Sequence, residues 1–344
     1  MIELSRYLEQ IIRGQSLSED ESSRMFQMIL MGGATPAQIA AILVALRMKG
    51  ETIAELTGAA RMLRSRAGEF PAAAYTLDTC GTGGDSAGTW NISTAVSFIV
   101  AAAGIPVAKH GNRAVSSQSG SADVLSALGV KIDAETETMA RALHEANICF
   151  LFAPKFHSAM RHVAPTRKEI GVRTVFNLLG PLANPAKTRF QLLGVYHEKW
   201  LEPLALVLGK LGCMRAWVVH GKDGLDEITT TTTTQVVEWY EGKIKSFTIS
   251  PEDLGIPLVS SDALTGGDAM HNAKALRALL SGTGPDAYRD IVCLNAAACL
   301  TIAGKSSSLQ EGLAQARSLL ESGAALKTLQ QLISLTNEEF RRDE

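Results

Sequence analysis

The sequence predicts an α/β protein with a small all-helical N-terminal domain and a large α/β domain built on a mostly parallel central sheet. Three observations predict this fold. Residues 1 to about 70 carry only helical signals, short apolar strands then alternate with helices, and glycine-containing loops follow several of these strands. Such alternation implies parallel strands joined by right-handed crossovers. We expect domains at residues 1–72 and 73–344, with part of residues 165–186 returning to the helical domain.

Composition narrows the classes of function. The chain has 344 residues, 46% of them hydrophobic, which is enough for a large core. A net charge of −2 argues against nucleic acid or membrane as a partner. The 5 cysteines are scattered without a C-x-x-C pair, so neither a disulfide framework nor a zinc site is indicated. Without a signal peptide or a membrane-spanning run, we expect a cytoplasmic protein.

Capping signals divide the first 70 residues into helices. Ser18 and Glu21 form a predicted capping box, as do Thr52 and Glu55. Between them Pro36 stands at the first position of another helix, where its missing N–H costs nothing. The apolar residues repeat at helical spacing, but no residue in this stretch suggests chemistry. We therefore expect it to serve in packing or subunit contact.

A glycine-rich loop follows the first predicted strand. Thr76 and Leu77 are expected to end that strand, and D-T-C-G-T-G-G-D occupies residues 78–85. Glycines allow the chain to turn sharply and expose its N–H groups. Residues 91–94 then begin a helix that runs to Ala103. The N-terminus of a helix offers free donors and a positive dipole end, which suit a phosphate group.

A second polar loop follows the next strand, which we expect over residues 106–108. Lys109 opens this loop, and a lysine among small donors suits a polyanion. Because parallel strands bring their carboxyl ends to one edge of the sheet, the two loops together predict a phosphate-bearing ligand. The alternative is that each loop is only a turn, since neither matches a Walker loop or a G-x-G-x-x-G fingerprint. The donors of the second loop are Asn112, Ser116, Ser117, Ser119 and Ser121.

The remaining elements follow from the same signals. In chain order, we expect helices over 121–128 and 135–146, a strand over 148–153, an interrupting segment over 154–186, a strand over 191–195, a helix over 197–211 and a strand over 215–219. A run of threonines at 229–234 leads into a strand that ends at Tyr240 and pairs with residues 243–249 as an antiparallel hairpin at the sheet edge. Further helices are expected at 268–280, 289–303 and 309–321.

Two candidate binding features lie beyond the first two loops. Asp226 and Glu227 are adjacent carboxylates in a third loop, and Mg²⁺ needs only one or two carboxylates plus ligand phosphates. Taken alone, such a pair is more often a solvated turn. Arg167 lies in the interrupting segment, between the two predicted units, where ligands often bind. Its alternative is a solvated surface charge.

Together these motifs closely resemble the anthranilate phosphoribosyltransferase family over nearly the whole chain. The resemblance implies transfer of phosphoribose from 5-phosphoribosyl 1-pyrophosphate (PRPP) to the amine of anthranilate with Mg²⁺, in tryptophan biosynthesis. It also implies a homodimer formed through the helical domains. Its marks are D-T-C-G-T-G-G-D (78–85), N-I-S-T (91–94), K-H-G-N-R-A-V-S-S (109–117), P-T-R-K-E-I-G-V-R-T-V-F-N-L-L-G-P-L-A-N-P (165–185), H-G-x-D-G-L-D-E (220–227) and G-G-D-A-x-x-N-A (266–273).

The resemblance also implies site residues, position by position. Ser93, Asp226 and Glu227 match metal positions. Gly81, Asn112 and Arg167 match anthranilate contacts, with His110 beside them. No acid or base is assigned, because the nucleophile is a ready amine. The implied PRPP contacts are Gly81, Gly84, Asp85, Thr89, Asn91, Ile92, Ser93, Thr94, Lys109, His110, Gly111, Asn112, Arg113, Ala114, Val115, Ser116, Ser117 and Ser121.

Departures from the family pattern are small, and two rival functions are weighed. Ser158 stands where the family often has proline, and threonines 229–234 stand where it often has Gly-Pro. Pyrimidine-nucleoside phosphorylases share the expected architecture, but the G-T-G-G-D loop with Asp226 and Glu227 favours PRPP and a metal. A related nucleic-acid-binding group would need a basic groove, which the net charge of −2 opposes.

Overall fold

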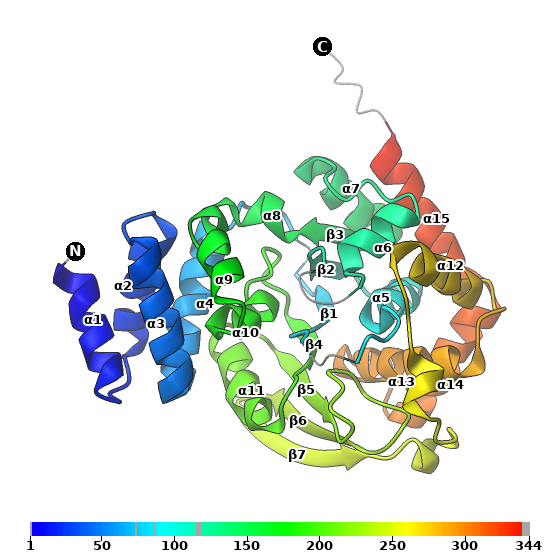
Figure 1. The fold of residues 1–344 in the computed structure, drawn as a ribbon. Coiled ribbons are helices and arrows are strands. Elements are labelled where there is room, and N and C mark those ends of the chain that lie inside the picture. The colour runs from blue at the N-terminus through cyan, green and yellow to red at the C-terminus, as the bar shows by residue number, and fades with distance from the viewer. Residues whose placement is uncertain (1, 73, 85–86, 115–117, 339–344) are drawn as a thin grey trace.

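The computed structural model describes residues 2–72, 74–84, 87–114 and 118–338. Four N-terminal helices lie at one side of the molecule, a twisted sheet occupies the middle, and the C-terminal helices cover its far side (Figure 1). Within the described residues no helix is long and apolar enough to cross a membrane. The sequence-predicted fold class, a helical N-terminal unit with a large α/β unit, is therefore confirmed.

The N-terminal helices form where the capping signals predict them. Ser18 accepts a hydrogen bond from the Glu21 N–H and Thr52 from the Glu55 N–H, and in both boxes the glutamate bonds back to the cap. Thr35 caps the helix that Pro36 begins. The four helices are α1 (Ile2–Ile12), α2 (Glu19–Leu30), α3 (Pro36–Lys49) and α4 (Ile53–Arg66).

The central sheet has seven strands in the order β3-β2-β1-β4-β5-β6-β7. The pairs from β3 to β5 are parallel, and β6 and β7 add the predicted antiparallel hairpin at one edge. The chain leaves β1 toward β2 and later returns to β4 on its other side. Ligands bind at such reversals, beyond the carboxyl ends of the strands. The strands are β1 (Leu77–Gly81), β2 (Val107–Gly111), β3 (Ile148–Phe152), β4 (Phe190–Gly194), β5 (Arg215–Gly221), β6 (Thr234–Tyr240) and β7 (Lys243–Ile249).

Three predicted strand boundaries are wrong. Leu77 begins β1 instead of ending it, and Lys109 lies inside β2 instead of opening the loop. Both strands therefore carry polar residues that the interior of the protein satisfies. The first five threonines of the run are not strand, since the Thr229 N–H donates back to Thr234 Oγ1 over 3.0 Å. The strand starts only at Thr234.

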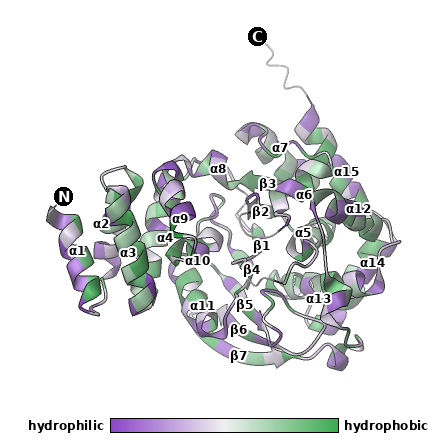
Figure 2. Ribbon diagram, in the orientation of Figure 1, coloured by the Kyte–Doolittle hydropathy of each residue, from purple (hydrophilic) through white to green (hydrophobic). Residues whose placement is uncertain are grey.

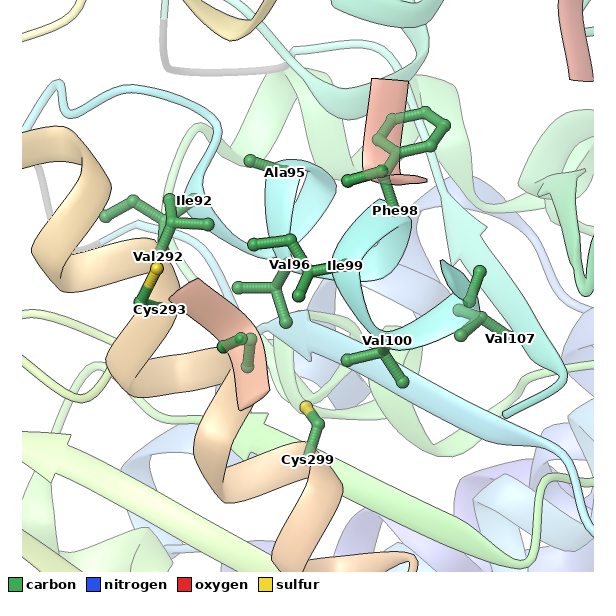
Figure 3. Close-up of a cluster of buried hydrophobic side chains, with 14 of the residues drawn as sticks. Ile92, Ala95, Val96, Phe98, Ile99, Val100, Val107, Val292, Cys293 and Cys299 are labelled. Carbon is green, nitrogen blue, oxygen red and sulfur yellow. The ribbon is translucent and has the colours of Figure 1, made fainter. Parts of the chain in front are cut away.

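One face of the sheet packs on a layer of helices in which α5 is buried almost all round. Figure 3 shows Val96 and Val100 of α5 gathered with Cys293 and Cys299 of α13. A helix this apolar is held rigidly, so its N-terminus is a fixed point at the edge of the sheet. This layer contains α5 (Ile92–Ala102), α6 (Ser121–Ala127), α7 (Thr136–Ala146), α12 (Ala269–Leu280), α13 (Asp286–Ile302), α14 (Leu309–Glu321) and α15 (Ala324–Asn337).

The opposite face of the sheet shares a core with the N-terminal helices. Leu204 and Leu208 of α11 (Leu201–Lys210) belong to this core, as do Phe176 and Leu179 of α10 (Val175–Leu182). The predicted helix at 197–211 is divided, because a 3-10 turn precedes α11. The interrupting segment also contains the short helices α8 (Ala153–Phe156) and α9 (Ala164–Ile170). Figure 1 shows α9 and α10 beside α3 and α4.

A buried ion pair joins the first turn of α4 to the C-terminal end of α3. Lys49 Nζ lies 2.9 Å from Glu55 Oε2, and the two side chains are only 7% and 1% exposed. The other carboxylate oxygen of Glu55 accepts the Leu17 N–H over 2.9 Å. Through these two interactions the Glu55 side chain connects α4 both to α3 and to the turn before α2.

We expect Glu55→Ala to lower the free energy of unfolding by about 3–5 kcal/mol, because it leaves Lys49 buried without its counter-charge. Denaturant titration of the helical signal measures this loss. Glu9→Ala is the matched control, since Glu9 and its partner Arg13 are 58% and 68% exposed. The control should cost less than about 1 kcal/mol. Equal losses in the two variants would contradict the assigned role of Glu55.

Candidate active site

The glycine loop after β1 holds a carboxylate of the third loop. The Gly83 N–H donates to Asp226 Oδ2 over 2.7 Å. Gly83 and Gly84 have φ values of +68° and +79°, which glycine adopts without strain. A Cβ on Gly81 would overlap the Asp226 carboxylate, and one on Gly194 would overlap its backbone carbonyl. Glycines at both positions therefore make room for Asp226 at the switch between β1 and β4.

The N-terminus of α5 holds the neighbouring carboxylate. The Ser93 N–H donates to Glu227 Oε1 over 3.2 Å, so this carboxylate lies at the positive end of the helix dipole. Lys109 Nζ donates to Ser93 Oγ over 3.2 Å and to Thr79 O over 2.7 Å. Four of the sequence-predicted residues, Ser93, Lys109, Asp226 and Glu227, are thereby brought to one edge of the sheet.

A buried aspartate, which the sequence reasoning missed, lies beneath this edge. Asp78 in β1 accepts hydrogen bonds from Asn184 Nδ2 over 2.8 Å and from the His110 N–H over 3.4 Å. Burial raises the pKa of its carboxyl, while the charge of Lys109 opposes that rise. Its place at the start of D-T-C-G-T-G-G-D was the available signal, because a carboxylate inside a buried strand requires partners.

The second loop is held by Asp123, another residue that the sequence reasoning did not assign. Asp123 stands at the third position of α6 and accepts the N–H groups of Ala114 over 2.9 Å and Gly120 over 3.0 Å. It also pairs with Arg113 at 2.9 Å. The start of α6 thus closes the loop on itself, and Ser121 is the first residue of that helix. A capping-box pattern at G-S-A-D was the signal for this role.

The positions of several predicted ligand contacts limit which of their groups could reach a ligand. Ile92 and Thr94 are 2% and 1% exposed, so their side chains lie in the core and only their backbone groups remain for a ligand. Thr89 forms an antiparallel bridge with Thr265. The Asn112 carbonyl accepts the Ala122 N–H over 3.2 Å. Gly111 ends β2, where a Cβ would overlap Ser121 Oγ. The predicted contacts Asp85, Val115, Ser116 and Ser117 lie outside the described residues.

His110 faces a second buried histidine that the sequence reasoning missed. The rings of His110 and His157 meet edge to face with centroids 5.2 Å apart. Burial lowers the pKa of His110 to about 3 and that of His157 to about 4. Each ring has an Nε2 without a hydrogen-bond partner within the described residues. Both rings are neutral at pH 7, so they offer an uncharged polar wall and only a weak base.

Arg167 lies on α9 with its guanidinium 5.1 Å from the ring centroid of Phe176. Burial lowers the pKa of this guanidinium. Within the described residues it forms no hydrogen bond or ion pair, and none joins it to Gly81 or Asn112. Hydrogen bonds among the described residues thus do not bring the three predicted acceptor contacts together.

A further arginine joins the glycine loop to the helical unit. Arg173 donates from Nη2 to the Gly84 carbonyl, and its guanidinium lies 4.5 Å from the ring centroid of Tyr196. Arg47 of α3 in turn donates to the Arg173 carbonyl. Arg173 too was missed by the sequence reasoning, although it stands in the long motif at 165–185.

The chemistry of the donors decides what the site holds. Within the described residues no cluster of three or more histidine, cysteine or acidic side chains is found. Asp226 and Glu227 lie together at this edge of the sheet, and a carboxylate pair of this kind would fit Mg²⁺, which needs only one or two carboxylates plus water and ligand phosphates. Burial raises the pKa of the Cys80 thiol well above its usual value, so this cysteine is no activated nucleophile. A separate groove of about 730 Å³, lined by Ile53, His197 and Phe247, contains none of the predicted residues.

Comparison with known proteins defines the class. A model of the glycosyl transferase family α/β domain matches residues 73–326, and a model of its helical bundle domain matches residues 5–67. The chain is thus a glycosyltransferase with both domains of that family.

Relatives narrow the class. Anthranilate phosphoribosyltransferase of Rhodospirillum rubrum is 55% identical over 94% of this chain and 93% of its own length. The solved enzyme of Thermus thermophilus is 42% identical and has a TM-score of 0.91 over 96% of this chain and 99% of its own. That of Saccharomyces cerevisiae, solved with PRPP and Mg, is 27% identical with a TM-score of 0.88 over 97% of each chain. The chain therefore belongs to the anthranilate phosphoribosyltransferase family.

Proposed function

We propose that this enzyme transfers the phosphoribosyl group of PRPP to the amine of anthranilate, giving N-(5-phosphoribosyl)anthranilate and pyrophosphate in tryptophan biosynthesis. The observation that carries the proposal is the pair Asp226 and Glu227, held by backbone N–H groups of the glycine loop and the α5 N-terminus beside buried Lys109. The yeast relatives support it, one solved with PRPP and Mg and another with 4-fluoroanthranilate.

The leaving group determines what the PRPP site must do. Loss of pyrophosphate builds negative charge on that group and positive charge on the ribose ring. Lys109 is a fixed donor for the negative charge, and preorganised donors of this kind commonly supply a large part of catalysis. Because Lys109 is only 2% exposed, water screens its charge little.

Asp226, Glu227 and the Ser93 hydroxyl are the residues that would hold Mg²⁺. A bound magnesium ion neutralises charge on the leaving pyrophosphate. The two carboxylates are 8% and 9% exposed, and each is already fixed by a backbone donor. The protein therefore reorganises little when the metal–PRPP complex binds.

Arg167 and the histidine pair form the proposed acceptor site. The guanidinium of Arg167, which has no ion-pair partner among the described residues, would bind the anthranilate carboxylate. The neutral rings of His110 and His157 would line the aromatic ring. Anthranilate brings its own nucleophile, the amine, so alignment with the ribose carbon supplies the remaining rate enhancement. No general base is assigned, in keeping with the low pKa of both histidines.

The organisation of the chain is also proposed. The helical domain is residues 1–72, joined by part of 165–186, and the α/β domain is residues 73–344. The packing of α10 against α3 and α4 supports this division. A homodimer forms through the helical domains. Ile12, Met31 and Met48 are 64%, 61% and 83% exposed on the helical unit, which supports this contact. The cytoplasmic location stays a prediction.

The reaction and its metal are tested together. We expect the wild-type protein with PRPP, Mg²⁺ and anthranilate to form N-(5-phosphoribosyl)anthranilate, and phosphate with uridine to give no turnover. Asp226→Ala combined with Glu227→Ala should lower the magnesium-dependent rate by orders of magnitude, because both fixed carboxylates are lost. The loss of anthranilate fluorescence measures the rate, and circular dichroism checks the fold. A double variant with the wild-type response to magnesium would rule out this metal site.

Recognition of the acceptor is tested at Arg167. A charge-assisted hydrogen bond contributes roughly 1.5–3 kcal/mol, so Arg167→Ala should raise the KM for anthranilate about ten- to a hundred-fold. The KM for PRPP should change much less, because the phosphate donors lie on other loops. Lys168→Ala is the matched control, since Lys168 is the exposed neighbour on the same helix. An effect on PRPP alone would refute the acceptor role.

The dimer is tested by charge on the exposed apolar face. Figure 2 shows α3 as apolar along much of its length, and Met48 lies near its end. Met48→Glu should shift the protein toward the monomer in sedimentation velocity, because a charge is costly in an apolar interface. Met270→Glu, at a side chain 69% exposed on α12, is the control and should leave the dimer intact. A monomeric wild-type protein would contradict the proposal.

A further inference from the structure

The motif at residues 266–273 has no role in the site described so far, yet the segment that begins it lies along the PRPP site. The Gly266 N–H donates to Gly88 O over 2.8 Å, and the Trp90 N–H donates to Leu264 O over 3.3 Å. Between these bonds Thr89 and Thr265 form an antiparallel bridge. The segment therefore pairs with the stretch that links the glycine loop to α5.

The motif ends in a buried asparagine whose orientation is fixed. Asn272 on α12 is 1% exposed. The Gly267 N–H donates to Asn272 Oδ1 over 2.8 Å. A backbone N–H only donates, so this side of the Asn272 amide must be its oxygen. Its Nδ2 therefore points the other way, where it donates to Asn91 Oδ1 over 2.9 Å.

The orientation of the Asn272 amide in turn fixes the orientation of Asn91, the N-cap residue of α5. Asn91 Oδ1 accepts from Asn272 Nδ2 and from Ser119 Oγ at 3.2 Å. The oxygen is thus occupied by donors, and Nδ2 is the end of the amide that remains. Its bond to Ser119 O is long, at 3.4 Å. At the N-terminus of α5, Asn91 therefore presents N–H groups, which suit a phosphate oxygen, instead of its carbonyl oxygen.

We propose that Asn272 is a positioning residue for PRPP. The Gly267 N–H fixes which way the Asn272 amide faces, and Asn272 in turn fixes the orientation of the Asn91 amide. Asn91 then directs its N–H groups toward phosphate and binds Ser119 of the second loop. This inference rests on the proposed function and deepens it, because it assigns Gly267 and Asn272 of the G-G-D-A-x-x-N-A motif to the orientation of the phosphate site.

Asn272→Asp is the variant that tests the relay. It keeps the shape and still accepts the Gly267 N–H, but it offers Asn91 a second acceptor in place of a donor. The Asn91 amide must then turn its oxygen toward the phosphate. We expect the KM and Kd for PRPP to rise about ten- to a hundred-fold, the loss expected for a hydrogen bond to a charged oxygen. The KM for anthranilate should change little. Asn272→Ala, which buries no charge, should raise the PRPP values less.

A double-mutant cycle separates the relay from simple repulsion between the new charge and PRPP. If Asn272 acts through Asn91, then Asn272→Asp should have almost no further effect on PRPP in an Asn91→Ala background. Repulsion would act equally in both backgrounds, and that result would overturn the proposal. Wild-type PRPP values in both Asn272 variants would also overturn it.

Asp268→Ala is the matched structural control. Asp268 caps the same helix by accepting the His271 N–H over 2.8 Å but does not lie on the relay. Asp268→Ala should lower the melting temperature and leave the KM for PRPP unchanged. If Asp268→Ala instead raised the KM for PRPP as much as Asn272→Asp does, the role of Asn272 would be packing alone, which would overturn the proposal. If the wild-type protein bound PRPP but formed no phosphoribosylanthranilate, the proposed function would fail, while the Kd values from calorimetry would still test the relay.

Discussion

Two backbone hydrogen bonds, from Gly83 to Asp226 and from Ser93 to Glu227, hold adjacent carboxylates at the carboxyl edge of the sheet. The rest of the site depends on this constraint. Glycine is required at Gly81 and Gly194, because any side chain there would displace Asp226. Each carboxylate is held in place because it accepts a backbone N–H group. In the proposed function these two carboxylates would hold a cation and its phosphate ligand.

Charge balance beneath the edge explains why the strands contain polar residues. Lys109 is buried inside β2, and the buried carboxyl of Asp78 interacts with its charge from the adjacent strand. Asn184 orients Asp78, so the interrupting segment contributes to the sheet interior as well as to the helical unit. Because α5 is packed on nearly all sides, the backbone donors at its N-terminus are held in fixed positions.

The sequence predicted the fold class, most of the helices and the convergence of Ser93, Lys109, Asp226 and Glu227, because these follow from local capping signals and from the common edge of parallel strands. It did not predict α8 and α9 or the break before α11. It misplaced the ends of β1 and β2, since polar residues in a buried strand look like loop until their partners are known. The sequence did not predict the hydrogen bonds between residues that lie far apart in the chain. Asn184 lies 106 residues from Asp78, and Arg173 lies 89 residues from Gly84.

The central claim is that the pyrophosphate of PRPP lies between the glycine loop and the α5 N-terminus, with a cation on Asp226 and Glu227. A crystal structure of the protein with PRPP and Mg²⁺ tests this most directly. The account predicts pyrophosphate oxygens within hydrogen-bond distance of backbone N–H groups of the glycine loop and the α5 N-terminus. It also predicts a metal ligated by at least one of the two carboxylates. Pyrophosphate bound in the groove beside Ile53 and His197, with both carboxylates retaining only their backbone bonds, would contradict it.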